Sequence, residues 1–444
     1  MAHTVGFISL GCAKNRVDAE MMMYQLREAG YTLVQDPAQA DVAVINTCGF
    51  IESAKQESIN EILELAELKK EGKIKAIVVT GCLAERYNTQ MMRELSEADA
   101  VIGIGKNADI AAVVRRALNG EKVEDFPDKL GLPLDGGRVQ STEAHWAYLR
   151  VADGCDNCCT YCAIPLIRGR FRSRSMENIV EEAERLVKNG VRELNVIAQD
   201  TTRYGEDNYG KLMLPELLRR LCKIDGLSWI RLLYCYPDRI TDELLDTIRE
   251  EEKIVNYIDL PLQHCEGGIL RAMNRRGDKD SLLSLVSHIR EKIPGVVLRT
   301  TLIAGFPGES DEDFMSLSDF VARAKFERLG CFAYSQEEDT PAALMADQID
   351  EDVKEHRAAL IGEQEALIMD EWCESCIGST IDVLVDGFDR YAECWTGRSA
   401  YDAPEVDPCV FFTASHRKPR PGDIVRVKIL DHIDCDLTGE MIES

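Results

Sequence analysis

Residues 154–174 read GCDNCCTYCAIPLIRGRFRSR and follow a run, AYLRVAD, that is typical of a buried strand. Within this stretch Cys155, Cys159 and Cys162 have the spacing Cys-x3-Cys-x2-Cys. Three thiolates on one tight loop can hold three irons of a four-iron cluster, which leaves the fourth iron free to bind a substrate. The stretch therefore predicts an iron-sulfur site on the first loop of a β/α domain.

A zinc knuckle or a purely structural cluster is the alternative interpretation of this loop. Cys158 is adjacent to Cys159 and allows a Cys155-x2-Cys158 pair of the zinc type. No second Cys-x2-Cys pair lies at the usual zinc-ribbon distance. We therefore favour the cluster, with Cys155, Cys159 and Cys162 as its ligands.

The sequence around this loop alternates strand-like and helix-like segments across residues 142–371. This alternation predicts the β/α units of a partial barrel related to the eight-stranded β/α barrel. In such barrels the active site lies at the carboxyl ends of the strands. The predicted strands are AYLRVAD (147–153), RELNVIAQD (192–200), WIRLLYCYP (229–237), YIDLPLQH (257–264), VVLRTTLIAGF (296–306) and RLGCFAYS (328–335).

Residues 1–135 show the same alternation, which predicts an open parallel sheet. Three more cysteines occupy equivalent positions in this region. Cys12 follows VGFISLG, Cys48 follows VAVINT and Cys82 follows AIVVTG, so each comes just after a predicted strand. Neighbouring parallel strands bring their carboxyl ends to the crevice where open α/β sheets bind ligands. We therefore expect a second three-cysteine cluster. Three unrelated buried thiols are the alternative.

Residues 379–444 change character to short β-rich runs with Gly, Pro and Asp between them, which predicts a small all-β barrel of OB-like type. A long charged helix precedes this segment. The segment contains 13 acidic and 7 basic residues. We expect acidic positions such as Asp382, Asp386 and Asp389 to steer a basic protein partner.

The chain of 444 residues contains 16 cysteines and has a net charge of −26. Its length predicts two or three domains. No run of about 18 apolar residues could span a bilayer, and the N-terminus lacks a secretion signal, so we expect a cytoplasmic protein with no membrane partner. Thiols stay reduced in that compartment, so metal ligation explains the cysteines better than disulfides do. Nine cysteines, including the pair Cys373 and Cys376, share no context with the six candidate ligands.

These motifs resemble the methylthiotransferase family of radical-SAM enzymes across essentially the whole chain. The resemblance implies an N-terminal domain over residues 1–135, a radical-SAM barrel over 142–371 and a TRAM domain over 379–444. Cys158, and Pro408 where glycine is usual, depart from the family pattern without removing a ligand. The blocks that carry the resemblance are SLGCAKNRVDAE (9–20), INTCGFI (45–51), VTGCLAERY (79–87), IAQDTTRYG (197–205), LPLQH (260–264), RTTLIAGFPGE (299–309) and GRSAYDAPEVD (397–407).

The resemblance also implies two 4Fe-4S clusters and S-adenosylmethionine as cofactors, with a low-potential electron donor as a partner. One S-adenosylmethionine would be the methyl donor and another the radical source. The cluster of Cys155, Cys159 and Cys162 would supply the electron for cleavage, and the N-terminal cluster would carry the methylated sulfur. Acid–base catalysis contributes about 10²–10⁴-fold, too little to activate an sp3 C–H bond, whereas a 5′-deoxyadenosyl radical can abstract its hydrogen.

Two blocks, SLGCAKN and GRSAYDAPEVD, resemble the branch that modifies an aspartate of ribosomal protein S-twelve within the small ribosomal subunit. A tRNA adenosine methylthiotransferase is the alternative, because it shares both clusters and the barrel. An RNA-docking TRAM domain should be basic, and this one is acidic. A non-catalytic iron-sulfur carrier would not need an open iron site together with such a barrel. We expect removal of the TRAM domain to impair substrate modification and to leave S-adenosylmethionine cleavage intact.

Two groups of barrel residues are candidates for S-adenosylmethionine contacts, because they end predicted strands. Polar strand caps and an ordinary Gly-Pro turn are the alternative interpretations. The arginines at 168, 170, 172 and 174 form a basic patch that either contacts substrate carboxylates or is solvated. The candidate cofactor contacts are Gln199, Asp200, Gly305, Phe306, Pro307, Gly308 and Glu309.

Overall fold

The computed structural model describes residues 3–415 and 417–442. Within this part, we find no helix that combines the length and the apolar character needed to cross a membrane. The chain divides into two compact units. The first contains Met1–Ser141, Ala152–Arg174 and Ser335–Ala343, and the second contains Thr142–Val151, Ser175–Tyr334 and Leu344–Ser444.

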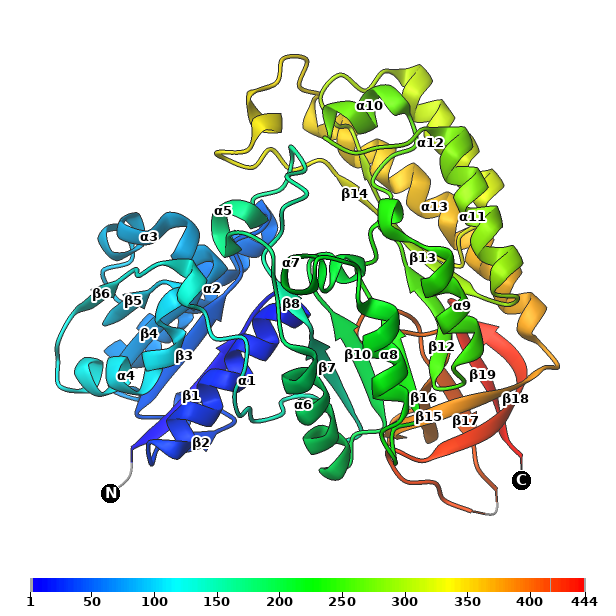
Figure 1. The fold of residues 1–444 in the computed structure, drawn as a ribbon. Helices are drawn as coiled ribbons and strands as arrows, with labels where there is room; N and C mark the ends of the chain where they lie inside the picture. The colour runs from blue at the N-terminus through cyan, green and yellow to red at the C-terminus, as the bar shows by residue number, and fades with distance from the viewer. Residues whose placement is uncertain (1–2, 416, 443–444) are drawn as a thin grey trace. The chain divides into compact units, whose positions relative to one another are not determined.

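The first unit is built on a six-stranded sheet of order β2-β1-β3-β4-β5-β6, in which every pair of neighbours is parallel (Figure 1). This confirms the open parallel sheet expected for the N-terminal region. The strands are β1 (Thr4–Ser9), β2 (Thr32–Val34), β3 (Val42–Thr47), β4 (Ala76–Gly81), β5 (Ala100–Ile102) and β6 (Val123–Asp125), and the longer helices are α1 (Ala13–Glu28), α2 (Glu52–Lys70), α3 (Cys82–Glu94) and α4 (Ile110–Leu118).

Alternation along the central strands divides the core of this sheet into two layers. Val42 and Val44 of β3 pack in one apolar cluster with residues of α1 and α4. Ala43 and Ile45 pack in a second cluster with residues of α2 and α3. Successive side chains of a strand point to opposite faces, so an uninterrupted apolar strand needs helices on both sides. The short hairpin of β8 (Ala152–Asp153) and β9 (Arg172–Ser173) and helix α5 (Ile164–Arg168) complete the unit.

The second unit contains a parallel sheet of order β14-β13-β12-β11-β10-β7, with helices between successive strands. This six-stranded open sheet confirms the predicted partial barrel. Its strands are β7 (Trp146–Arg150), β10 (Glu193–Ile197), β11 (Trp229–Leu232), β12 (Ile254–Asp259), β13 (Val297–Ala304) and β14 (Arg328–Ala333). Its helices are α6 (Met176–Lys188), α7 (Glu206–Tyr209), α8 (Leu214–Cys222), α9 (Asp242–Glu250), α10 (Gly267–Ala272), α11 (Lys279–Lys292) and α12 (Asp311–Ala324).

Helix α13 (Glu351–Cys376) leads from this sheet to a closed five-stranded barrel of order β15-β16-β17-β19-β18, drawn in orange to red in Figure 1. Its apolar core includes Val383, Val410, Phe412 and Val427. The small all-β barrel predicted at the C-terminus is therefore confirmed. The strands are β15 (Thr380–Asp389), β16 (Cys394–Ser399), β17 (Val410–Thr413), β18 (Ile424–Ile433) and β19 (Asp436–Met441).

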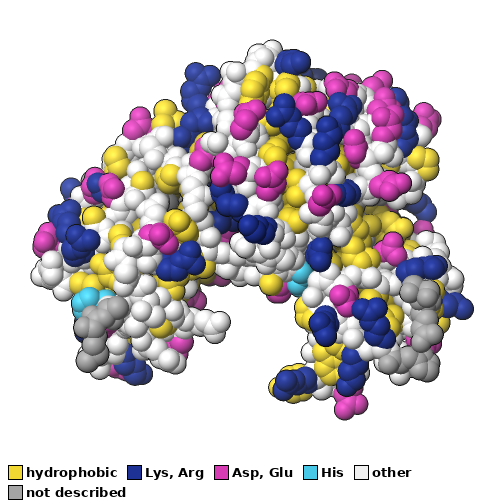
Figure 2. Space-filling model, turned by 60° about the horizontal axis from the view of Figure 1, so that its bottom comes forward, with side chains coloured by type: hydrophobic (Ala, Val, Ile, Leu, Met, Phe, Trp, Pro, Cys, Tyr) yellow, Lys and Arg dark blue, Asp and Glu magenta, His cyan; other side chains and the backbone are white. Residues whose placement is uncertain are grey.

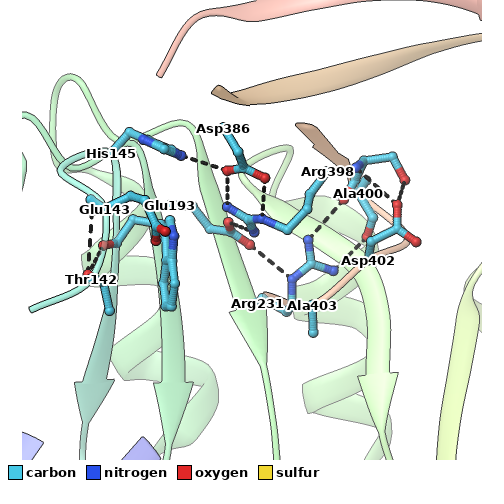
Figure 3. A network of polar contacts seen from close by, with 12 residues as sticks. Thr142, Glu143, His145, Glu193, Arg231, Asp386, Arg398, Ala400, Asp402 and Ala403 are labelled. Atoms are coloured by element: carbon cyan, nitrogen blue, oxygen red, sulfur yellow. Dashed lines mark hydrogen bonds and ion pairs between the residues drawn. The ribbon is translucent and has the colours of Figure 1, made fainter. Parts of the chain in front are cut away.

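Buried ion pairs join this barrel to the amino-terminal end of the parallel sheet (Figure 3). Arg398 of β16 pairs with Glu193, the first residue of β10, and donates to both carboxylate oxygens of Asp386 at 3.0 and 3.1 Å. Glu193 also accepts from Arg231 Nε of β11 at 3.0 Å, and His145 Nε2 lies 2.7 Å from Asp386 Oδ1. Since Glu193, Arg231 and Arg398 are buried, each charge depends on its partners.

The turn that follows β16 extends the same network along the sheet. Asp407 accepts a hydrogen bond of 2.6 Å from Tyr257 Oη of β12 and pairs with Arg299 of β13. Asp402 accepts from Arg328 Nη2, at the start of β14, at 2.7 Å. The C-terminal barrel therefore supplies carboxylates to arginines on neighbouring strands, and removing it would leave those charges without their partners.

These contacts change two expectations. Asp386 is half-buried and ion-paired, so the expectation that it helps to steer a basic partner is wrong, whereas Asp382 is exposed. Segment 397–407, which suggested the branch of the family, contains the residues that anchor the barrel. Removal of residues from Ser379 onward is therefore expected to destabilise the parallel sheet of the second unit, instead of leaving cleavage of S-adenosylmethionine intact.

We predict that Arg398→Met lowers the free energy of unfolding of the second unit by about 3–5 kcal/mol, because it leaves Glu193 and Asp386 without their shared partner. Arg426→Met is the matched control, since Arg426 lies on an exposed position of β18 and should cost no more than about 0.5 kcal/mol. Urea unfolding of the full chain measures both. Equal losses for the two variants would contradict the importance of the network.

The same comparison has a defined pH dependence. Burial raises the pKa of Asp386, but His145 and Arg398 outweigh burial and hold it below its ordinary value. The stability that Asp386 contributes is thus present above the pKa of the unfolded chain, about 3.9, and is lost as the pH falls through the lower folded value. The difference between wild type and Arg398→Met should therefore persist at neutral pH and shrink below about pH 4.

Candidate functional site

Three cysteines of the first unit follow the adjacent strands β1, β3 and β4. Cys12 immediately precedes α1, Cys48 follows β3, and Cys82 begins α3. Besides burial, the charge of Cys12 raises the pKa of Cys48, and the charges of Cys12 and Cys48 raise the pKa of Cys82. At Gly11, where φ is +84°, an added Cβ would lie 2.8 Å from the Cys48 sulfur. Glycine therefore permits the close approach of the first two loops.

Asn15, in the first turn of α1, holds two of these loops together. Its side-chain amide donates to the backbone oxygens of Leu10 at 2.7 Å, Asn46 at 3.3 Å and Thr47 at 3.2 Å, which precede Cys12 and Cys48. Asn15 is buried, so the amide hydrogens and the strand-end carbonyls satisfy one another away from solvent.

Ser58 of α2 fixes the backbone at Cys48. The Cys48 N–H donates to Ser58 Oγ at 3.0 Å, and the same hydroxyl donates to the Cys48 carbonyl at 2.9 Å. Ser58 is buried. The N–H and the carbonyl of Cys48 are thus both hydrogen-bonded, and the thiol takes no part in these contacts.

Cations and burial act on the thiols in opposite directions. Burial raises the pKa of Cys82 to about 12 and also raises that of Cys48. At Cys12, desolvation raises the pKa, but the charges of Lys14 and Arg168 outweigh it and hold the pKa below its ordinary value. Because metal ligation requires the thiolate, these cations favour the ligated form.

Arg168 lies at the end of α5 and is fully buried. Its Nη2 donates to Asp18 Oδ2 at 2.8 Å and lies 3.7 Å from the Cys82 sulfur, and its Nη1 donates to Asp153 Oδ1 at 3.0 Å. Asp18 belongs to α1, and Asp153 comes two residues before Cys155. One guanidinium therefore contacts residues of both predicted cluster sites.

The loop with the Cys-x3-Cys-x2-Cys spacing belongs to the same unit. The Cys155 N–H donates to the Gly169 carbonyl at 3.1 Å, and the Cys162 N–H donates to the Cys159 carbonyl at 3.0 Å. Cys158 is exposed and has a left-handed backbone with φ of +50°. The structure thus gives Cys158 a local environment different from that of Cys159, which is buried.

The cysteines of both sites have the chemistry that an iron-sulfur cluster requires, since thiolates are the soft ligands that such clusters take. Across residues 3–415 and 417–442, no three His, Cys, Asp or Glu side chains converge as they would around a single metal ion. The cysteines of a four-iron cluster bind different irons, so they need not converge on one point. The six cysteines remain the predicted ligands.

The candidate cofactor contacts of the barrel belong to the second unit. Asp200 follows β10 and caps a short turn: its Oδ1 accepts from Arg203 N at 3.2 Å, and its Oδ2 accepts from Arg239 at 3.1 Å. Gln199 precedes it, with its side-chain oxygen buried. Asp200 therefore acts as a polar cap after its strand, which was the alternative interpretation of this residue. A contact of Gln199 or Asp200 with S-adenosylmethionine stays a prediction.

Residues 305–309 form a tight turn after β13. Glu309 Oε2 accepts from the Gly305 N–H at 2.9 Å, and Glu309 Oε1 accepts from Arg357 at 2.8 Å. Phe306 is fully buried against Tyr334, with ring centroids 5.4 Å apart. Glu309 therefore maintains the shape of the turn, and contacts of Gly305, Phe306, Pro307, Gly308 and Glu309 with a cofactor stay predictions.

The arginines after the cluster loop do not form one basic patch. Arg168 is buried between carboxylates, Arg174 pairs with Asp135 at 2.7 Å, and Arg172 donates to the Leu130 carbonyl. Of the four arginines, only Arg170 is exposed. Arg168 lies on helix α5 and Arg172 on the short strand β9, while Arg170 and Arg174 lie outside both elements, so the four side chains do not share one face.

Sequence reasoning did not single out Asn15, Ser58, Asp18 or Arg168 as parts of the cysteine site. Asn15 and Asp18 lie in the block SLGCAKNRVDAE, three and six residues after Cys12. This places them on the first turns of a helix that begins beside the thiol, which is the signal that could have identified them. Ser58 contacts Cys48 from a position ten residues further along the chain, whereas the contacts of Arg168 with Asp18 and Cys82 join segments distant in sequence.

Comparisons with known proteins place the chain in a family. Three family profiles match it: uncharacterized protein family UPF0004 over residues 4–103, the Radical SAM superfamily over 149–321, and the TRAM domain over 377–442. Among solved structures, a radical S-adenosylmethionine methyltransferase, TsrM, from Kitasatospora setae is similar with a TM-score of 0.57 and 13% identity, over 87% of this chain and 79% of that one. This similarity concerns the fold.

Curated relatives are similar over nearly the whole chain. A protein of Desulforamulus reducens is 48% identical over 99% of this chain and 100% of its own length, and one of Geobacter sulfurreducens is 45% identical over 99% and 98%. A protein of Clostridioides difficile is 46% identical over 98% of both chains. Each of the three is named ribosomal protein uS12 methylthiotransferase RimO. Identity at this level along the entire chain means that this protein belongs to the family of the ribosomal protein uS12 methylthiotransferase RimO.

Proposed function

We propose that this chain is a radical-SAM methylthiotransferase that adds a methylthio group to the β-carbon of an aspartate in ribosomal protein uS12. The observation that carries this proposal is the identity of 45–48% with relatives of that name over essentially the full length. The substrate would be uS12 within the small ribosomal subunit, in the cytoplasm, and a low-potential electron donor would be required.

Two 4Fe-4S clusters and S-adenosylmethionine are the cofactors of this proposal. Cys155, Cys159 and Cys162 would hold one cluster, and the thiols of the first three loops would hold the other. When bound, these groups supply the electron for reductive cleavage of S-adenosylmethionine and the sulfur that is methylated and transferred. The three N-terminal thiols that would serve are Cys12, Cys48 and Cys82.

The chain's own residues prepare the N-terminal thiols for ligation. Asn15 ties together the backbone before Cys12 and Cys48, and Ser58 satisfies the backbone of Cys48. Arg168 places positive charge beside Cys82. The contacts of Asn15 and Ser58 fix the loops without using a sulfur atom, and the charge of Arg168 favours the thiolate of Cys82.

The residues at the strand ends of the second unit would bind S-adenosylmethionine. Gln199 and Asp200 after β10 and the turn of residues 305–309 after β13 both lie at carboxyl ends of the parallel sheet, where β/α barrels bind their ligands. Gly305 and Gly308 have left-handed backbones, which keep the turn compact.

A tRNA adenosine methylthiotransferase is the second candidate, and the sequence identity favours the ribosomal substrate. An RNA-docking surface gathers Lys and Arg on one face. On the face drawn in Figure 2, basic and acidic side chains are interspersed. The net charge of −26 also suits a basic ribosomal protein better than a phosphate backbone.

We predict that the anaerobically reconstituted protein binds about eight irons, as two four-iron clusters. Replacing Cys155, Cys159 and Cys162 by Ala should remove about half of the iron and abolish 5′-deoxyadenosine formation. Replacing Cys12, Cys48 and Cys82 by Ala should remove the other half, abolish methylthio transfer and preserve 5′-deoxyadenosine formation. Iron analysis and chromatography measure these outcomes.

Cys158→Ala is the matched control for the ligand assignment, because Cys158 lies in the same loop and is exposed. It should retain the full iron content. Loss of a cluster in this variant, or full iron content in the Cys155, Cys159 and Cys162 triple variant, would show that the assignment is wrong. Circular dichroism of each variant shows whether it remains folded.

For the substrate, we predict that purified enzyme with S-adenosylmethionine and a reductant modifies uS12 in small ribosomal subunits isolated from cells that lack the enzyme. Mass spectrometry of uS12 peptides should locate the methylthio group on one aspartate. Unmodified tRNA, offered in a parallel reaction, should remain unchanged. Methylthiolation of a tRNA adenosine with uS12 untouched would instead establish the second candidate.

A further inference from the structure

We infer that Arg168 is a positioning residue that couples the two predicted cluster sites, holding Cys82 of the N-terminal site against the loop of Cys155, Cys159 and Cys162. The inference rests on the proposed function, because it assigns clusters to both loops.

Connectivity makes Arg168 suited to this role. It lies six residues after Cys162, at the end of α5, and its partner Asp153 lies two residues before Cys155. The pair Arg168–Asp153, with an Nη1–Oδ1 distance of 3.0 Å, therefore ties the two ends of the cluster loop together. Both side chains are fully buried, so water does not compete for the ion pair that holds the two ends of the loop together.

The other end of the guanidinium reaches the N-terminal site. Arg168 Nη2 lies 2.8 Å from Asp18 Oδ2, 3.4 Å from Asn15 Oδ1 and 3.7 Å from the Cys82 sulfur. Asn15 is the residue whose amide holds the strand ends before Cys12 and Cys48. Arg168 is thus connected to all three N-terminal loops, directly or through one side chain.

Apolar packing supports the same connection independently of charge. Cys82 forms a buried cluster with Ala163 and Ile167. Ala163 immediately precedes helix α5, and Ile167 lies within it. Helix α5 therefore contacts Cys82 through its apolar side chains as well as through Arg168. A rearrangement of either loop would disturb the packing of the other.

Arginine is the side chain that this geometry requires. Its planar group presents five N–H donors in a fixed fork and can bridge two carboxylates and a sulfur at once. A lysine ammonium would retain the charge but could not span Asp153, Asp18 and Cys82 from one position. Positioning and charge can therefore be separated by substitution.

Two consequences follow for a bound N-terminal cluster. N–H groups directed at a ligand sulfur, and a positive charge nearby, stabilise the more negative, reduced form and raise the reduction potential. Partners that hold metal ligands in place typically contribute 10–100-fold to metal affinity or activity. Arg168→Met should lose both effects, and Arg168→Lys should preserve most of the potential while losing the positioning.

The test uses the full chain in which Cys155, Cys159 and Cys162 are replaced by Ala, so that only the N-terminal cluster is observed. In this background we compare Arg168 with Arg168→Lys and Arg168→Met. Redox titration followed by electron paramagnetic resonance measures the midpoint potential, and release of iron to a chelator measures retention. Arg27→Met is the control, because it removes an exposed cation from the same helix, α1, that carries Asp18.

Arg168→Met should lower the midpoint potential and accelerate iron loss about 10–100-fold, whereas Arg168→Lys should retain the potential but lose iron faster than wild type. Arg27→Met should change neither. If Arg168→Met fails to fold, the iron loss of Arg168→Lys decides the matter. Unchanged potential and iron release in the Arg168 variants would overturn the inference.

The uS12 assay with the unmodified enzyme keeps this inference distinct from the proposed function. If the wild-type enzyme modifies uS12 but the Arg168 variants behave as wild type in potential and iron release, the role of Arg168 alone is wrong. If the wild-type enzyme leaves uS12 unmodified while the Arg168 variants shift the potential, the coupling of the loops holds and the substrate assignment is wrong.

Discussion

The parallel alignment of strands is the constraint on which both units depend. Parallel strands place all their carboxyl ends at one edge of a sheet and all their amino ends at the other. In the first unit this brings the loops of Cys12, Cys48 and Cys82 together. In the second unit it places Gln199 and residue 305 at one edge and leaves the opposite edge to the C-terminal barrel.

Buried arginines connect segments that the parallel sheets alone would leave independent. Arg168 joins the cysteine loop of residues 155–162 to α1 and Cys82, and Arg398 joins β16 to β10. A guanidinium removed from water requires several partners, so each arginine fixes the position of more than one segment. The free energy gained by such a pair is small, but removing one partner is costly, and this asymmetry makes the arrangement specific.

The role of segment 397–407 illustrates how a sequence resemblance and a physical role can differ. The segment suggested a ribosomal substrate, yet its side chains contact the amino-terminal ends of the catalytic strands. The C-terminal barrel is therefore part of the structure of the catalytic sheet as well as a candidate for substrate binding. Asp386 and Asp407 of this barrel form ion pairs with Arg398 and Arg299 within the protein. Exposed carboxylates such as Asp382 are available to contact a protein partner.

The sequence by itself determined the three folds, because hydrophobic periodicity of strands and helices is local and the cysteines stand at fixed places after strand-like runs. It also predicted that Cys12, Cys48 and Cys82 lie at neighbouring strand ends. Only the tertiary structure placed Arg168 against Cys82 and Arg398 against Glu193, which are 86 and 205 residues apart in sequence. A charged residue looks solvated in sequence, and whether it is buried depends on carboxylates that distant segments bring to it.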